Sequence, residues 1–145
     1  MANQFIPYGR QHITQTDIDA VVAVLQSDFL TQGSQVPAFE ERVAAYTGAK
    51  FGVAVNSATS ALHIACLALG LGQGEKGKDD WLWTTPITFT ASANCGLYCG
   101  ANIDFVDIDP LTLNMSINAL EEKLQLANAE NRLPKIVVPV HFTGE

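Results

Sequence analysis

The sequence predicts an α/β fold in which helices cover both faces of a mostly parallel sheet. Short β-branched or aromatic runs alternate along the chain with helical segments, and most links between them are only a few residues long. Because strands connected through helices in this way run in the same direction, the alternation indicates βαβ units. Ligands of such sheets bind beyond the carboxyl ends of the strands, and we expect a binding site at that edge.

The composition fits one folded domain and excludes several classes of partner. The chain has 145 residues, of which 48% are hydrophobic and 16% charged. A net charge of -7 argues against nucleic acids and anionic membranes, because both are bound by basic surfaces. The start of the chain lacks the pattern of a secretory signal, and the longest apolar run is too short to cross a bilayer. The odd set of Cys66, Cys95 and Cys99 favours a reducing cytoplasm.

Two amphipathic helices are predicted in the first third of the chain. The first follows Thr16 as its N-cap, and its apolar side chains share one face (Ile18, Val21, Val22 and Leu25). The second carries Phe39, Val43 and Tyr46 on one face and ends at Gly48. We expect the apolar face of the first helix to pack against another part of the protein.

A strand, a turn and a helix are predicted over residues 51–69. The strand covers residues 51–55, and Ser57, Thr59 and Ser60 then place hydroxyl groups in the first turn of the helix. Backbone N–H groups lack helical partners in that turn, which also carries the positive end of the helix dipole. An anion such as a phosphate is expected there. The alternative is that Ser57 only caps the helix, a role that serine fills without any ligand.

The rest of the chain alternates three further strands with two helices. The strands are predicted at residues 81–84, 103–108 and 135–140. One helix opens at Pro86 and Thr88 and runs toward Gly100, and the other is capped by Ser116 and turns Ile117, Leu120 and Leu124 inward. Four strand ends therefore bring candidate ligand-binding segments to one edge of the sheet, namely residues 56–60, 84–89, 107–109 and His141.

Other chemistry-bearing patterns are weaker. Residues 72–77 match G-x-G-x-x-G, but they follow a helix and precede a strand, which is the reverse of the order that dinucleotide binding needs. The three histidines are too scattered to indicate a metal site, and no metal is expected. Asp107 and Asp109 fit either a solvated turn or carboxylates beside a ligand. Phe89, taken alone, would be a core aromatic residue.

Six blocks of the sequence resemble the N-terminal portion of DegT/DnrJ-type sugar aminotransferases, in that family's order and near its spacing. They are residues 29–33 with 39–40, 54–63, 85–94, 100–101, 105–109 and 139–144. The resemblance implies part of the large domain of a fold-type I transferase, a three-layer α/β/α structure, with residues 1–145 as its N-terminal segment. It also implies pyridoxal 5'-phosphate as cofactor and a homodimer.

The resemblance assigns roles to residues of this chain by matching motif. Thr59 and Ser60 would bind the cofactor phosphate, and Phe89 would stack on the pyridine ring. A second group would line the sugar-nucleotide pocket: Tyr8, Asp28, Phe29, Leu30, Thr31 and Ala58. Several blocks are most similar to transaminases of pseudaminic acid biosynthesis. That similarity implies transfer of an amino group from glutamate to C4 of a UDP-linked 4-keto-6-deoxy-N-acetylhexosamine.

The same resemblance implies that catalysis needs residues outside this chain. The lysine that binds the cofactor covalently is expected beyond Glu145, so the 145-residue segment is expected to be inactive alone. Two alternatives stay open. The chain could be a non-catalytic module that binds phosphate or a partner, or part of a related sugar dehydratase in which histidine replaces the lysine.

Overall fold

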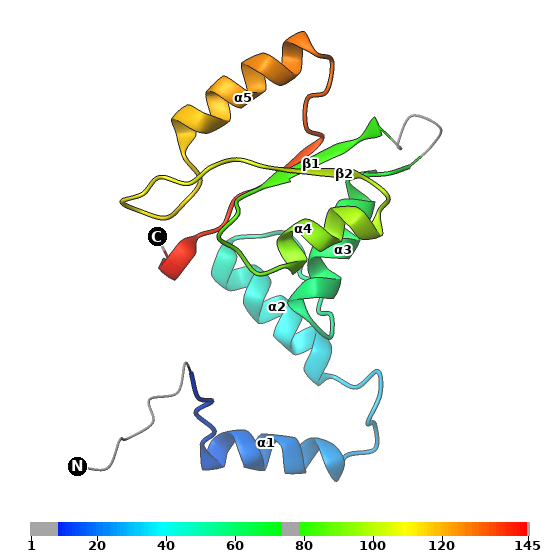
Figure 1. The fold of residues 1–145 in the computed structure, drawn as a ribbon. Helices are drawn as coiled ribbons and strands as arrows, with labels where there is room; N and C mark the ends of the chain where they lie inside the picture. Colours follow the sequence, from blue (N-terminus) through cyan, green and yellow to red (C-terminus); the bar gives the residue numbers. More distant parts are fainter. Residues whose placement is uncertain (1–8, 74–78, 145) are drawn as a thin grey trace, which may run out of the picture. The chain divides into compact units, whose positions relative to one another are not determined.

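The computed structural model describes residues 9–73 and 79–144. The chain divides into two units, Met1–Ala54 and Val55–Glu145. Each unit has its own helices, and among the described residues the sheet belongs to the second unit. The ribbon in Figure 1 labels the elements along the sequence.

The first unit consists of α1 (Gln15–Leu25) and α2 (Gln35–Thr47). The predicted N-cap, Thr16, is wrong, because α1 begins earlier, after Thr14. Thr14 and Asp17 form a capping box in which the Asp17 carboxylate accepts from the Thr14 N–H at 2.7 Å. The prediction that α2 ends at Gly48 is confirmed, since this residue is left-handed with φ of +73°. Within the first unit, no residue of α1 is buried.

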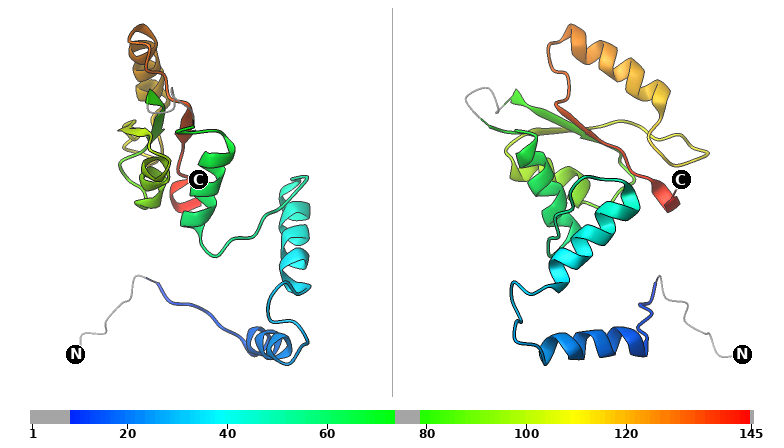
Figure 2. Two further views of the ribbon diagram at one scale, coloured as in Figure 1. Left: turned by 90° about the vertical axis from the view of Figure 1, so that its right-hand side faces the viewer. Right: turned by 180° about the vertical axis from the view of Figure 1, so that it is seen from behind.

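The second unit is a parallel three-stranded sheet between helices. Its strands are β1 (Trp81–Thr84), β2 (Asn102–Phe105) and β3 (Ile136–Val138), in the order β2-β1-β3. β1 pairs in parallel with both neighbours. Helices α3 (Ala58–Ala68) and α4 (Ala91–Tyr98) lie on one face and α5 (Ile117–Ala129) on the other, as Figures 1 and 2 show. The predicted α/β class is therefore confirmed.

The core of the second unit has two layers because successive side chains of β1 point to opposite faces. Leu82 is fully buried against Cys66 of α3 and Cys95 of α4. Trp83 is buried on the other face, beside Val106, which follows β2, and beside Ala127 of α5. Burial, together with the neighbouring Cys95, raises the pKa of the Cys66 thiol to about 12, so Cys66 is a neutral core residue.

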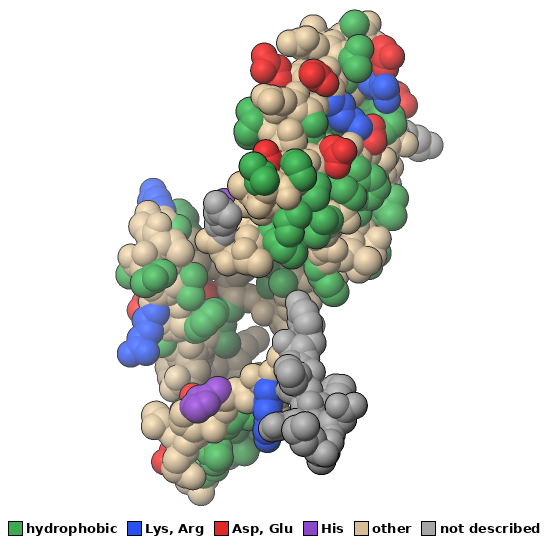
Figure 3. All heavy atoms as spheres, turned by 60° about the vertical axis from the view of Figure 1, so that its left-hand side comes forward, with side chains coloured by type: hydrophobic (Ala, Val, Ile, Leu, Met, Phe, Trp, Pro, Cys, Tyr) green, Lys and Arg blue, Asp and Glu red, His purple; other side chains and the backbone are tan. Residues whose placement is uncertain are grey.

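Residues 51–55 do not form the predicted strand. A strand needs a neighbour to pair with its backbone, and no described strand pairs with this segment. The side chains of Phe51 and Val53 are 77% and 78% exposed. Instead of a strand partner, the Ala54 N–H donates a hydrogen bond to the Glu40 carboxylate at 2.8 Å. Exposed hydrophobic side chains of this kind recur over the surface (green in Figure 3).

Three further predictions are corrected in the second unit. α4 begins at Ala91 and not at Pro86, because residues 85–90 form a turn-rich loop after β1. Ile117 is 73% exposed, while Leu120 and Leu124 pack inward as predicted. β2 and β3 are shorter than the predicted strands at residues 103–108 and 135–140. Residues 74–77 of the glycine-rich match lie outside the described part of the chain.

The length of the helices bears on membrane insertion. Over residues 9–73 and 79–144, no helix combines the length and the apolar character needed to cross a bilayer.

A tight turn at Gly72 fastens the end of α3 near the end of α4. Gly72 has φ of +72°, and its N–H donates to the Asp80 carboxylate at 2.9 Å. A Cβ built on Gly72 would lie 1.7 Å from the carbonyl oxygen of Cys99, which is far closer than two non-bonded atoms can approach. Gly100 has nearly the same conformation, φ +76°, but open space around it. A substitution at Gly100 therefore tests the cost of the left-handed backbone alone, whereas the same substitution at Gly72 adds the cost of steric overlap.

We predict that Gly72→Ala destabilises the protein much more than Gly100→Ala. A left-handed alanine costs about 1 kcal/mol in each case, and the overlap with Cys99 adds at least about 2 kcal/mol for Gly72 alone. Urea denaturation of the full-length protein measures both losses. Equal losses would contradict the described turn.

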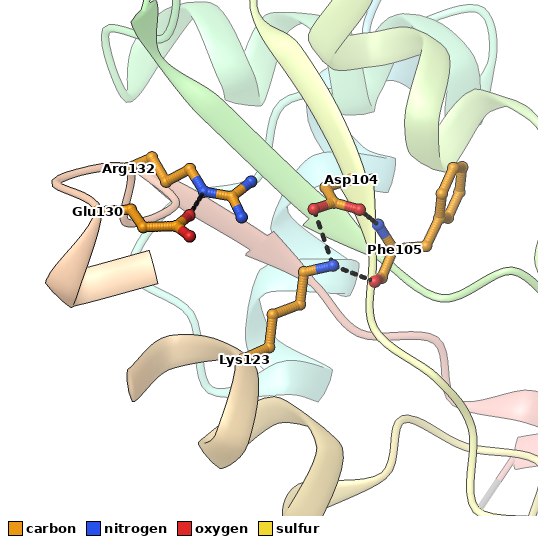
Figure 4. Close-up of polar contacts among 5 residues, drawn as sticks. All are labelled: Asp104, Phe105, Lys123, Glu130 and Arg132. Atoms are coloured by element: carbon orange, nitrogen blue, oxygen red, sulfur yellow. Dashed lines mark hydrogen bonds and ion pairs between the residues drawn. The ribbon is translucent and has the colours of Figure 1, made fainter. Parts of the chain in front are cut away.

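Lys123 of α5 forms polar contacts with β2 (Figure 4). Its ammonium group lies 2.8 Å from the Asp104 carboxylate and donates to the Phe105 carbonyl at 2.7 Å. The ammonium also lies 5.2 Å from the ring centroid of Trp83. Burial alone raises the pKa of Asp104, but the hydrogen bonds from Lys123 and the Phe105 N–H outweigh it and hold that pKa below its ordinary value.

Because the folded state lowers the pKa of Asp104, the contribution of Asp104 to stability is present above the unfolded pKa of about 3.9 and is lost as pH falls through the folded pKa. We predict that Asp104→Asn lowers the free energy of unfolding at pH 7 by at most about 1 kcal/mol. The gap to the wild type should close in acid below about pH 4. Urea denaturation of both proteins at pH 7 and below about pH 4 checks this prediction. Glu130→Gln, which touches only the exposed ion pair with Arg132, is the control and should change stability less.

Candidate functional site

The first turn of α3 holds a chain of polar side chains. Ser57 caps the helix, and its hydroxyl oxygen accepts from the Ser60 N–H at 3.1 Å. The Ser57 hydroxyl donates to the Ser60 hydroxyl at 3.0 Å, and Ser60 in turn donates to the Asn56 carboxamide oxygen at 2.8 Å. Ser57 is exposed, whereas Thr59 and Ser60 are half-buried. Two of the hydroxyl groups predicted for this turn, those of Ser57 and Ser60, are therefore joined by a hydrogen bond.

This turn is electrostatically suited to an anion. The first backbone bond inside the helix runs from the Ala61 N–H to the Ser57 carbonyl, so the N–H groups of Ala58 and Thr59 precede the helical hydrogen-bond ladder. The positive end of the α3 dipole lies at the same place, and the first turn contains no acidic residue. This turn thus offers two backbone N–H groups outside the helical ladder and no carboxylate to oppose a phosphate.

Phe89 lies in the loop between β1 and α4. It precedes Thr90, the N-cap of α4, and its side chain is 72% exposed. Its expected place in the core is therefore wrong. Thr84, the last residue of β1, donates to the Val138 carbonyl at 2.9 Å, and Thr88 of the loop donates to the Ser92 hydroxyl of α4 at 2.8 Å. An exposed aromatic ring in such a loop can stack on a ligand.

The acidic residues after β2 accept hydrogen bonds from backbone N–H groups of the turn in which they lie. The Asp109 carboxylate accepts from the N–H groups of Leu111 and Thr112 at 2.8 and 3.1 Å. The Asp107 carboxylate accepts from its neighbour Ile108. Of the two interpretations left open by the sequence, these contacts favour the turn.

The predicted substrate-binding residues that the structure describes are divided between the two units. Asp28, Phe29 and Leu30 line a cavity of about 360 Å³ in the first unit, between the end of α1 and the start of α2, and Thr31 does not line it. Ala58 is the first residue of α3, in the second unit. Tyr8 lies outside the described residues.

One contact at this site has no counterpart in the sequence-based expectations. Asn56 belongs to a block that resembles the family, but no role is predicted for it. The structure joins its carboxamide to Ser60. A short amide four residues before a helical serine is the signal that could have indicated this contact.

Comparison with known proteins shows the family to which this chain belongs. The family model of the DegT/DnrJ/EryC1/StrS aminotransferases matches residues 11–145, which is most of the chain. The chain belongs to the DegT/DnrJ/EryC1/StrS aminotransferase family. The predicted family resemblance is thereby confirmed.

Curated relatives of this DegT/DnrJ chain include two bacterial proteins. It is 40% identical over 143 residues to the spore coat polysaccharide biosynthesis protein SpsC of Bacillus subtilis, covering 99% of this chain and 34% of SpsC. It is 46% identical over 103 residues to the UDP-4-amino-4,6-dideoxy-N-acetyl-beta-L-altrosamine transaminase of Campylobacter jejuni, covering 71% of this chain and 26% of that protein. The chain thus spans about a third or less of these relatives.

Solved structures of family members share its fold. Helicobacter pylori PseC, an aminotransferase of pseudaminic acid biosynthesis, matches with a TM-score of 0.79 and 32% identity over 95% of this chain and 34% of PseC. The PMP form of the sugar aminotransferase Spr1654 of Streptococcus pneumoniae matches with a TM-score of 0.80 and 30% identity over 96% of this chain and 32% of Spr1654. A PLP form of Spr1654 also matches. These forms indicate pyridoxal phosphate as the family's cofactor.

The donors of the α3 turn fit the phosphate of that cofactor. A phosphate ester is an acceptor that carries close to two negative charges at neutral pH. The turn offers it two backbone N–H groups and the hydroxyl-bearing side chains of Thr59 and Ser60, with no acidic side chain in the turn.

Proposed function

We propose that this chain is the N-terminal segment of the large domain of a pyridoxal-phosphate-dependent sugar-nucleotide aminotransferase. The complete enzyme would transfer an amino group from glutamate to C4 of a UDP-linked 4-keto-6-deoxy-N-acetylhexosamine, in pseudaminic-acid-type biosynthesis. The observation that carries the proposal is the 46% identity to a transaminase named for such an aminated UDP-sugar. The similarity of fold to PseC supports the same substrate class.

Thr59 and Ser60 are proposed to bind the phosphate of the cofactor. Their position in the first turn of α3 places the Thr59 N–H and the two hydroxyl-bearing side chains where the helix dipole would stabilise the charge of a bound anion. Phe89 is proposed to cover one face of the pyridine ring, for which its exposed side chain at the start of α4 is suited. The cofactor, when bound, supplies an electron sink for moving an amino group between carbon atoms.

The substrate-binding role of Tyr8, Asp28, Phe29, Leu30, Thr31 and Ala58 remains a proposal. The cavity beside Asp28, Phe29 and Leu30 supports it with a surface that is both apolar and polar. A UDP-sugar carries a diphosphate, while the chain has a net charge of -7, so local donors have to hold the substrate. A homodimer in the cytoplasm is part of the same proposal.

None of the described lysines is proposed as the residue that binds the cofactor covalently. Such a lysine must be able to lose its proton and reach the cofactor. Lys123 is held by Asp104, and Lys135 lies 3.0 Å from the Asp80 carboxylate and donates to the Gly70 carbonyl at 2.7 Å. The ammonium of Lys50 lies 5.3 Å from the ring centroid of Phe51. The catalytic lysine is proposed to lie beyond Glu145, as the family resemblance implies.

The activity is tested with the product of the complete coding sequence. Incubation with a UDP-4-keto-6-deoxy-N-acetylhexosamine, glutamate and pyridoxal phosphate should give an aminosugar that mass spectrometry detects. Ser60→Ala should weaken pyridoxal phosphate binding at least about 10-fold, because a charge-assisted hydrogen bond is lost. Ser116→Ala, which removes a serine hydroxyl at the start of α5, is the control and should leave the dissociation constant within about twofold.

Two results would contradict the proposal. A dehydrated sugar without added nitrogen would favour the dehydratase alternative. A complete protein that has no affinity for pyridoxal phosphate would favour a non-catalytic binding module.

A further inference from the structure

The hydroxyl hydrogen of Ser60 is already engaged within the chain. Ser60 donates to the Asn56 carboxamide oxygen at 2.8 Å and accepts from the Ser57 hydroxyl at 3.0 Å. A serine hydroxyl has one hydrogen and two lone pairs, so in this arrangement Ser60 has no hydrogen left for another acceptor. A phosphate close to its doubly charged form is an acceptor that needs that hydrogen. Donation by Ser60 to a phosphate therefore requires that the bond to the Asn56 oxygen be broken.

The Asn56 carboxamide can supply this change without moving the backbone. Its two ends have nearly the same shape, but one is an acceptor and the other a donor. The terminal torsion of asparagine has a broad, roughly two-fold profile, so a half-turn exchanges the oxygen for the NH₂ group. The NH₂ group then donates to the Ser60 hydroxyl oxygen. Ser60 accepts from Ser57 and Asn56, and its hydrogen is released toward the anion.

We propose that Asn56 is a positioning residue for the cofactor phosphate. Its oxygen holds the Ser60 hydroxyl while the turn is empty, and its NH₂ group orients the same hydroxyl when the phosphate is bound. This inference rests on the proposed function, because it takes the phosphate of pyridoxal phosphate as the anion at α3. Aspartate has the same shape as asparagine, but when ionised it only accepts and is negative. Asn56→Asp should therefore hold the Ser60 hydrogen permanently.

Binding of pyridoxine 5'-phosphate to the full-length protein measures this effect without catalysis. The compound carries the phosphate but no aldehyde, so covalent attachment to a lysine does not enter. Asn56→Asp should raise its dissociation constant at least about 30-fold at pH 8, through the lost charge-assisted bond and the added charge. Binding of pyridoxine, which lacks the phosphate, should change less than about twofold. Asn118→Asp adds the same charge on α5, across the sheet from α3, and should leave both constants unchanged.

A double-mutant cycle separates positioning from simple repulsion. Charge repulsion by the introduced aspartate persists when Ser60 is replaced, whereas the effect on the Ser60 hydroxyl disappears. In a Ser60→Ala background, the penalty of Asn56→Asp should be at least about fivefold smaller than in the wild type. Asn56→Ala is the second variant. It frees the Ser60 hydroxyl, so it should bind pyridoxine 5'-phosphate at least about 10-fold more tightly than Asn56→Asp.

The outcomes distinguish the two proposals. Equal penalties for Asn56→Asp in both backgrounds would overturn the positioning role, even if the wild type prefers the phosphorylated compound. If Asn56→Asp does not fold, an Asn56→Ala penalty that is unchanged by Ser60→Ala and exceeds threefold overturns it as well, because such a penalty reflects a structural role. A wild type that binds pyridoxine and pyridoxine 5'-phosphate equally would instead overturn the proposed function.

Discussion

The proposed site depends on one constraint, which is that the first N–H groups of a helix have no carbonyl above them to accept their hydrogen bonds. In α3, Ser57 serves the N–H of Ser60, while those of Ala58 and Thr59 remain before the helical ladder. No acidic side chain occupies the first turn of α3. By contrast, Asp17 closes the capping box of α1 with Thr14. The anion binding that we propose for α3 thus follows from which residues begin the helix.

The rest of the second unit holds this turn in place. Cys66 and Cys95 bury one side of α3 and α4 against Leu82, and Gly72 allows the chain to pass close to Cys99. On the other face, Trp83 packs against α5, and Lys123 links that helix to β2. β1 is buried on both faces at Leu82 and Trp83, and residues 85–90, which follow it, leave the Phe89 side chain exposed.

Local patterns predicted what depends on local chemistry. The caps at Ser57 and Ser116 and the left-handed Gly48 are fixed by neighbours in sequence, and all are confirmed. The strand at residues 81–84 is confirmed as well, and it pairs with β2 and β3. The strand at residues 51–55 was not found, because pairing depends on a partner strand that local pattern does not supply. The contact between Asn56 and Ser60 was missed because a side-chain hydrogen bond depends on rotamers, which composition and spacing do not specify.

A crystal structure of the full-length protein with pyridoxal phosphate tests the central claim most directly. The claim predicts the phosphate at the first turn of α3, with the Thr59 N–H and the Ser60 hydroxyl within about 3 Å of its oxygens and the Asn56 carboxamide turned away from its present orientation. A phosphate bound elsewhere in the protein, with the chain of hydrogen bonds from Ser57 through Ser60 to Asn56 unchanged, would contradict it.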